Sequence, residues 1–187
     1  MDVRDARPAD AEAVGRVHLG AVDELGPDAY DEEQVVAWGR SSEPSDYAVD
    51  GDDNRFVVAE RDGDVRGFGE LTYSPGDYLD PADDDEVKAV YVRPTATRLG
   101  VGPALLEELE RDAWENGFEM VGLWASRNAV PFYEQRGYER VVERTHEFGE
   151  EVEGTVAEYP ERAVSRRLIG TAVSHFGMSV IRVAEHR

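Results

Sequence analysis

The chain has 187 residues, 41% of them hydrophobic, and a formal net charge of -21 at pH 7. That length and apolar content allow one domain with a substantial core and leave too little chain for two. The sequence contains no cysteine, which excludes disulfides, a thiolate nucleophile and zinc held by cysteine.

The charge indicates which partners to expect. Acidic side chains outnumber basic ones by 41 to 20, so the chain would repel the phosphates of a nucleic acid over most of its surface. No run approaches about 18 consecutive apolar residues, and the N-terminus is acidic, which predicts a cytoplasmic protein without membrane contact. Lys88 is the only lysine. An acidic chain so poor in lysine resembles proteins of salt-loving archaea.

The hydrophobic periodicity and the turn signals predict short strands and helices in the first half of the chain. In order, they are a strand over residues 3–6, a helix over 8–22, a helix from 31, a loop over 40–54, and two antiparallel strands over 55–60 and 65–73. Asp31 and Gln34 form a capping box at the start of the second helix, and Asp62-Gly63 supplies a tight hairpin turn.

The second half follows a polar stretch over residues 74–85. The predicted elements are a strand over 87–92, an amphipathic helix over 100–116 that ends at Gly117, a strand over 120–125, a short helix over 128–136, and a hairpin over 138–148 and 151–159. From about residue 163 onward the hydrophobic residues show no clear periodicity.

The most informative segment joins the strand that ends before Pro94 to the following helix. Gly100 and Gly102 lie in the turn, where the free N–H groups of a helix start and the positive end of its dipole suit an anion. Arg98 would add a charge-assisted contact. The turn lacks the third glycine of a dinucleotide fingerprint, because Leu105 stands there, and it lacks the Gly-Lys-Ser/Thr of a P-loop. An ordinary turn with glycines at a helix start remains the alternative.

A second motif lies about 30 residues downstream, where the sequence A-x-x-F-Y-E-x-x-G-Y spans residues 129–138. Together with the R-x-G-x-G-x-x-L-L turn and the opening RPADAEAV, it resembles the GNAT superfamily of N-acetyltransferases over residues 1–160. The resemblance implies one α/β (α+β) domain, whose mixed, mostly antiparallel twisted sheet is flanked by helices and holds acetyl-coenzyme A (acetyl-CoA) at a splayed strand pair. Residues 161–187 would form a C-terminal extension of unknown role.

The resemblance also implies a set of contacts to the acetyl donor. The backbone that pairs with the pantetheine arm would be Val90, Tyr91 and Val92, and the turn around the pyrophosphate would be Arg98, Leu99, Gly100, Val101, Gly102 and Pro103. The chain departs from the family pattern at two places. Thr97 replaces the usual Gln or Arg that opens the turn, and Ser126, with Asn128 two residues on, replaces an Asn that often contacts the cofactor.

Two side chains are candidates for the chemistry that the family performs. Tyr133 of the F-Y-E element would protonate the departing thiolate, and Glu86 at the start of the central strand would act as a base through water. Glu70 is the rival base. The structural alternative for Tyr133 is a tyrosine that only packs in the core. The structural alternative for Glu86 is a solvated carboxylate at the end of an acidic run. A backbone N–H near Val90 would stabilise the oxyanion.

The acceptor that the resemblance implies is an amine, on either a small molecule or a peptide, and the sequence does not distinguish between the two. His18, Tyr30 and Trp38 are candidates to line its site. His146 and the other C-terminal histidines show no metal spacing, so no metal is expected. A homodimer remains open.

The rival to an enzyme is a GNAT-like module that binds acyl-CoA as a sensor or assembly part, and an acidic scaffold with an accidental glycine turn is a third reading.

The charge leads to a test of the salt-loving interpretation. Repulsion between carboxylates should destabilise the fold most in dilute buffer, because molar salt shortens the Debye length to about 3 Å. A gain of about 2 kcal/mol from screening would raise Tm by roughly 4–8 °C between dilute and molar KCl in thermal melts at pH 7. Near the isoelectric point of about 4.4 the gain should disappear. A midpoint at pH 7 that is constant or falls with salt would contradict the interpretation.

Overall fold

The computed structural model describes residues 1–40, 47, 49–74, 85–118, 120–138, 142–149 and 152–163. Outside these residues lie 75–84 of the polar stretch predicted over 74–85, 41–46 and 48 of the loop predicted over 40–54, and the C-terminal segment from 164. The proposed boundary at residue 160 therefore stays a prediction. None of the described helices is long and apolar enough to cross a membrane.

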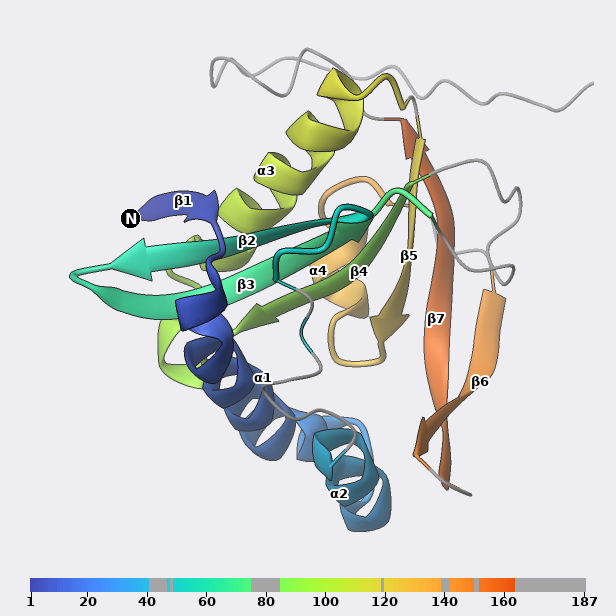
Figure 1. The fold of residues 1–187 in the computed structure, drawn as a ribbon. Coiled ribbons are helices and arrows are strands. Elements are labelled where there is room, and N and C mark those ends of the chain that lie inside the picture. The colour runs from blue at the N-terminus through green and yellow to red at the C-terminus, as the bar shows by residue number, and fades with distance from the viewer. Residues whose placement is uncertain are drawn as a thin grey trace, which may run out of the picture.

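The described strands form one seven-stranded mixed sheet in the order β1-β2-β3-β4-β5-β7-β6 (Figure 1). The strands are β1 (Asp2–Asp5), β2 (Asn54–Arg61), β3 (Asp64–Thr72), β4 (Asp85–Val92), β5 (Met120–Ser126), β6 (Val142–Gly149) and β7 (Val152–Ala163). Only β4 and β5 pair in parallel, and the other neighbours are antiparallel. The predicted fold class, a mixed and mostly antiparallel sheet, is confirmed.

Helices cover both faces of this sheet. They are α1 (Ala11–Leu25), α2 (Glu32–Arg40), α3 (Val101–Glu115) and α4 (Val130–Glu134), with single 3-10 turns at Pro8–Asp10, Gly26–Asp28 and Pro94–Ala96. One core cluster joins α3 and α4 to one face of β2–β5, and two smaller clusters join α1 and α2 to the other face. Residues on the central strands therefore face one helix pair or the other according to their position in the pleat.

The local signals that the sequence offered have the expected geometry. The Asp31 carboxylate accepts the N–H of Gln34 at 2.9 Å, and the Gln34 side chain accepts the N–H of Asp31 at 3.2 Å, which confirms the capping box. Asp62 and Gly63 have φ of 56° and 80°, as a two-residue hairpin turn between twisted strands requires. Gly117 has φ of 92° directly after α3.

Helix α3 is fixed to the sheet by close packing. A Cβ atom added at Gly67 of β3 would lie 2.8 Å from Val101 Cγ1 and 3.0 Å from Leu105 Cδ1. Only glycine at this position lets the first turns of α3 approach the strand so closely. The beginning of α3 is thus held at a defined height above β3 and β4.

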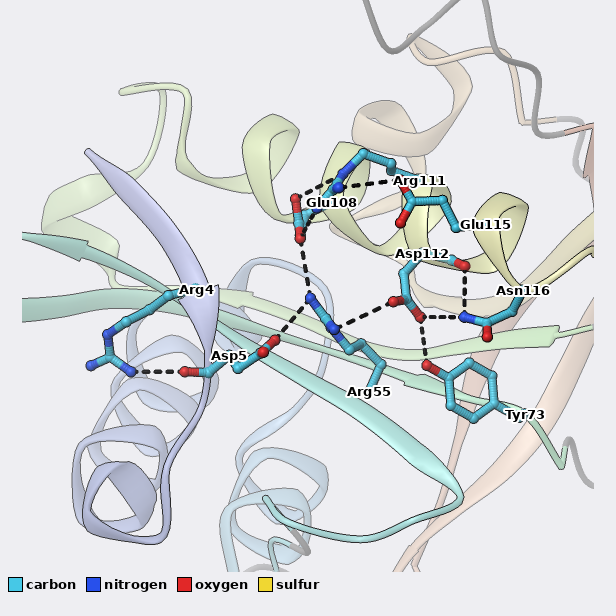
Figure 2. A network of polar contacts seen from close by, with 9 residues as sticks. All are labelled: Arg4, Asp5, Arg55, Tyr73, Glu108, Arg111, Asp112, Glu115 and Asn116. Atoms are coloured by element: carbon cyan, nitrogen blue, oxygen red, sulfur yellow. Dashed lines mark hydrogen bonds and ion pairs between the residues drawn. The ribbon is translucent and has the colours of Figure 1, made fainter.

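A polar network fixes the other end of α3 (Figure 2). Arg55 of β2 contacts Asp5 of β1 at 2.8 Å, and Glu108 and Asp112 of α3 at 3.2 and 3.4 Å. The Tyr73 hydroxyl donates to Asp112 Oδ2 at 2.5 Å. Because Asp112 is 8% exposed, these partners balance a carboxylate that would be costly to bury alone.

Candidate active site

Strands β4 and β5 separate part-way along their length. They pair only through Asp85–Val87 and Val121–Leu123. Beyond these pairs β4 continues beside β3 to Val92, β5 continues beside β7 to Ser126, and the two strands diverge (Figure 1). Within the described residues, the β5-facing edge of β4 over residues 88–92 has no strand partner, so its backbone groups remain available to a ligand.

The divergence confirms the predicted splayed strand pair. A β-bulge lies where the strands part, since Leu71 pairs with Val87 and Glu70 with Ala89, which leaves Lys88 as the extra residue of β4. Val90, Tyr91 and Val92 follow the bulge on the open edge. Their contact with a pantetheine arm stays a prediction.

The chain passes from β4 to α3 through a compact turn. Arg98 and Gly100 have positive φ of 60° and 81°, and Gly100 caps α3. The first hydrogen bond of the helix runs from the N–H of Ala104 to the carbonyl of Gly100, at 3.2 Å. The N–H groups before Ala104 at the start of α3 therefore have no acceptor within the helix, and the helix dipole favours an anion beside them.

The residues of the turn are accessible at its tip and buried beneath it. Arg98, Leu99 and Gly100 are exposed, Leu99 at 62%, whereas Val101 and Gly102 are buried. Pro103 in the first helical turn has no N–H and so loses no hydrogen bond there. The residues predicted to contact the anion therefore form two groups, an exposed group at the tip of the turn and a buried group at the start of α3.

The two turn glycines meet different needs. A Cβ atom at Gly102 would lie 3.0 Å from Phe132 Cε2 of α4 and 3.6 Å from Val92 Cγ2, so this glycine allows close packing of α3. A Cβ atom at Gly100 would meet no heavy atom within 4 Å, so only its positive φ favours glycine.

Tyr133 lies in α4, on the same face of the sheet as α3. Its side chain is 5% exposed and packs edge-on against Phe132 and Tyr138, with ring centroids at 4.9 and 5.5 Å. Burial is the main cause that raises the pKa of Tyr91, and the nearby phenols of Tyr47, Tyr133 and Tyr30 add to it. Val90 and Val92 of the open edge of β4 pack against the core cluster that contains Tyr133.

The two candidate bases are neighbours. Val87 belongs to the core beneath α3, so Glu86 beside it in β4 faces the α1 side, where Glu70 of β3 also lies. Glu86 is 4% exposed, and Glu70 accepts a hydrogen bond from Asn54 Nδ2 at 3.0 Å. Burial raises the pKa of the Glu70 carboxyl, Lys88 opposes this effect, and Glu86 adds to it. The geometry thus brings both carboxylates to the part of β4 where β5 departs.

Aromatic side chains from α1, α2 and the segments on either side of α2 gather around Tyr91 of β4. Trp38 Nε1 donates to the Tyr91 hydroxyl at 3.2 Å, and the Tyr30 and Trp38 rings lie edge to face at 5.5 Å. The His18 ring lies 4.5 Å from that of Tyr91, and its Nδ1 is 2.6 Å from the Tyr47 hydroxyl. His18, Tyr30 and Trp38 are thus brought together, while their contact with an acceptor stays a prediction.

The residues after β5 contact the end of α1 and the turn that follows it. Asn128 Nδ2 donates to the carbonyl of Leu25 at 3.1 Å, and the N–H of Arg127 donates to the Tyr30 hydroxyl at 2.9 Å. The carbonyl of Ser126 accepts the N–H of Ala129 at 2.8 Å. Asn128 therefore has a structural partner, and the cofactor contacts proposed for Ser126 and Asn128 remain predictions.

Sequence reasoning missed three residues of this region. Tyr47 lies in the predicted loop, where no periodicity marked it. Tyr138 donates its hydroxyl proton to Glu110 Oε1 at 2.9 Å, and both side chains are buried. One signal was available, because Glu110 lies one helical turn after Leu106 on the apolar face of α3. Among the described residues, no group of three or more His, Cys, Asp or Glu side chains is placed to hold a metal ion.

The profile of the acetyltransferase (GNAT) family matches residues 21–138, which is more than half of the chain. The chain belongs to the GNAT acetyltransferase family. The family matches the resemblance predicted from the two motifs, and the matched residues include β4, the glycine turn, α3 and α4. A search of curated protein sequences gives no match.

Solved structures agree with this assignment. A GCN5-related N-acetyltransferase of Rhodopseudomonas palustris is 25% identical, with a TM-score of 0.72 over 85% of this chain and 94% of that one. The PaiA N-acetyltransferase of Thermoplasma acidophilum, solved in complex with coenzyme A, is 22% identical, with a TM-score of 0.60 over 85% and 98%. The ribosomal-protein-alanine N-acetyltransferase of Brucella melitensis is 22% identical, with a TM-score of 0.58 over 84% and 98%. The last two show the fold alone.

The burial of His18 predicts a pH dependence of stability. Burial lowers its pKa from 6.5 to about 4, so the folded state keeps a neutral imidazole where the unfolded chain takes up a proton. Stability should therefore fall as the pH drops from about 6.5 toward 4. In urea unfolding at pH 7, 6 and 5, a His18→Gln variant should lose less stability than the parent. Equal losses in both proteins would contradict a lowered pKa for His18.

Proposed function

We propose that the protein is an N-acetyltransferase that passes the acetyl group of acetyl-CoA directly to an amine in a ternary complex. The observation that supports this most strongly is the divergence of β4 from β5, which leaves a free backbone edge beside Tyr133, Glu86 and the exposed glycine turn. A free strand edge can bind the amide groups of a pantetheine arm by adding its hydrogen bonds to the sheet.

The reaction requires an amine nitrogen without its proton. A lysine-like amine has a pKa near 10.4, so at neutral pH a base must accept one proton. In our proposal Glu86 accepts it through a water, and Glu70 is the rival for this role. The nitrogen lone pair then attacks the thioester carbonyl carbon, and a backbone N–H near Val90 stabilises the oxyanion.

Collapse of the tetrahedral intermediate breaks the carbon–sulfur bond. The sulfur leaves as a thiolate, and Tyr133 donates its phenolic proton to it. Tyr133 suits this step because it is 5% exposed and belongs to the core cluster against which Val90 and Val92 of the open edge of β4 pack. As the intermediate collapses, the nitrogen releases its second proton to solvent, so the products are the neutral acetylated amine and free coenzyme A. Solvent then returns a proton to the tyrosine.

A small amine, a peptide N-terminus and a protein lysine would all meet the aromatic side chains of His18, Tyr30 and Trp38. Acetyl-CoA turnover against a panel of such amines tests the enzyme, whereas tight acyl-CoA binding without turnover on any amine would favour the alternative, a sensor or assembly module.

The glycine turn provides a matched test of cofactor binding. Gly100 and Gly117 flank α3, both have positive φ, and an added Cβ would meet nothing within 4 Å at either position. Changing either to Ala should cost about 1–2 kcal/mol of stability. Only Gly100→Ala should weaken acetyl-CoA binding, by roughly tenfold if a similar energy is lost from the free energy of binding. Calorimetry that finds equal affinity in the two variants would remove the turn from the binding site.

Tyr133 should act in the chemical step and contribute little to binding. The thiolate becomes strongly basic only as the carbon–sulfur bond breaks, so the interaction belongs to the transition state. We expect Tyr133→Phe, which keeps the ring and its packing, to lower kcat on the order of 10²-fold with little change in KM for acetyl-CoA. Steady-state kinetics measures both quantities, and calorimetry checks that the variant still binds acetyl-CoA. Turnover at the parent rate where chemistry is limiting would make the tyrosine a packing residue.

A further inference from the structure

A buried carboxylate in α3 has no part in the proposed chemistry. Glu110 is 5% exposed, on the helix face that packs against the sheet. Its Oε1 atom accepts the hydroxyl proton of Tyr138, which is 3% exposed, at a donor–acceptor distance of 2.9 Å. A carboxylate is costly to bury, and hydrogen bonds that hold it are correspondingly valuable. This contact therefore fixes the Tyr138 ring relative to α3.

Tyr138 in turn contacts Tyr133. Its backbone N–H donates to the carbonyl of Tyr133 at 3.2 Å, across a chain reversal at Gly137, whose φ is 82°. The two rings lie edge to face, with centroids 5.5 Å apart and an angle of 74°. A shift of the Tyr138 ring would thus be transmitted to the Tyr133 ring through both backbone and side chain.

A second ring that contacts Tyr133 also packs against α3. The Phe132 ring packs edge-on to Tyr133, with centroids 4.9 Å apart, and abuts Gly102 at the start of α3. Arg136 covers Phe132, with its guanidinium carbon 3.9 Å from the ring centroid. Tyr133 therefore contacts two rings, and α3 anchors the first, Phe132, through Gly102 and the second, Tyr138, about two turns later, through Glu110.

We propose that Glu110 and Tyr138 are positioning residues that set the place of the Tyr133 hydroxyl relative to the thioester. This inference rests on the proposed role of Tyr133. The start of α3 carries the turn expected to bind the pyrophosphate, so one rigid helix would locate both the acetyl donor and the proton donor. Proton transfer depends steeply on such placement, because a displacement of about 1 Å can cost 10²-fold in rate.

The test is a double-mutant cycle on kcat. Tyr138→Phe keeps the ring and deletes the hydroxyl that holds Glu110, and we expect it to lower kcat about tenfold with unchanged KM for acetyl-CoA. In a Tyr133→Phe background the same change should cause no further loss, because no phenolic proton remains to be placed. Glu110→Gln retains an acceptor for Tyr138 and should keep most of the activity, whereas Glu110→Leu should match Tyr138→Phe.

Tyr73→Phe is the matched control. It also deletes a phenol hydroxyl that donates to a carboxylate of α3, Asp112, but Tyr73 lies in the network at the far end of the helix from Gly102 (Figure 2). Thermal melts should show that both Tyr→Phe changes lower Tm, while only Tyr138→Phe lowers kcat.

Three results would overturn the inference. Equal losses of kcat from Tyr138→Phe in the parent and Tyr133→Phe backgrounds would mean that Tyr138 only supports the fold. An unchanged kcat in Tyr138→Phe would mean that the Tyr138 hydroxyl does not position Tyr133. Parent activity in Tyr133→Phe itself would remove the proposed proton donor, and with it the inference, which separates that failure from the other two.

Discussion

The arrangement of the candidate site depends on the loss of pairing between β4 and β5. Parallel hydrogen bonds between these strands stop after Val87 and Leu123, at the bulge formed by Lys88. A strand edge buried in a protein without partners is costly, so an open edge in the middle of a sheet is maintained only because other elements support it. Here α3 and α4 pack on one side of the divergence, and α1 and α2 pack on the other. The opening is thus held by the packing of both faces.

Helix α3 connects the supporting contacts. Gly67 lets its first turns lie close to β3, Gly102 lets them lie close to α4, and the Arg55 network fixes its later turns to β1 and β2. A helix fixed at both ends moves as a rigid body, so the turn at its start keeps a constant relation to the open edge of β4. Sites on such rigid elements hold reacting groups more accurately than sites on loops.

The sequence predicted those parts of the molecule that local chemistry determines. The capping box at Asp31, the turn at Asp62-Gly63 and the end of α3 before Gly117 follow from residue type and spacing, and the family motifs supplied the mixed, mostly antiparallel sheet and the splayed pair. Contacts between distant residues gave no such signal. The proximity of Glu70 to Glu86 depends on strand register and on the bulge, and the bond from Tyr138 to Glu110 depends on how α4 docks on α3. Neither is encoded in a local pattern.

The acidic surface and the glycine turn are compatible for a physical reason. A chain with a net charge of -21 would repel a pyrophosphate at long range, and a compensating patch of lysines is absent because the sequence contains only Lys88. Backbone N–H groups at a helix start bind an anion by short-range hydrogen bonds and the local dipole, without a formal charge. Salt screens interactions between exposed charges over a Debye length but weakens contacts at hydrogen-bond distance much less. A protein that is stabilised by high salt would therefore bind an anionic acetyl donor better through N–H groups than through exposed cations, and Arg98 would need to contribute only a single charged contact.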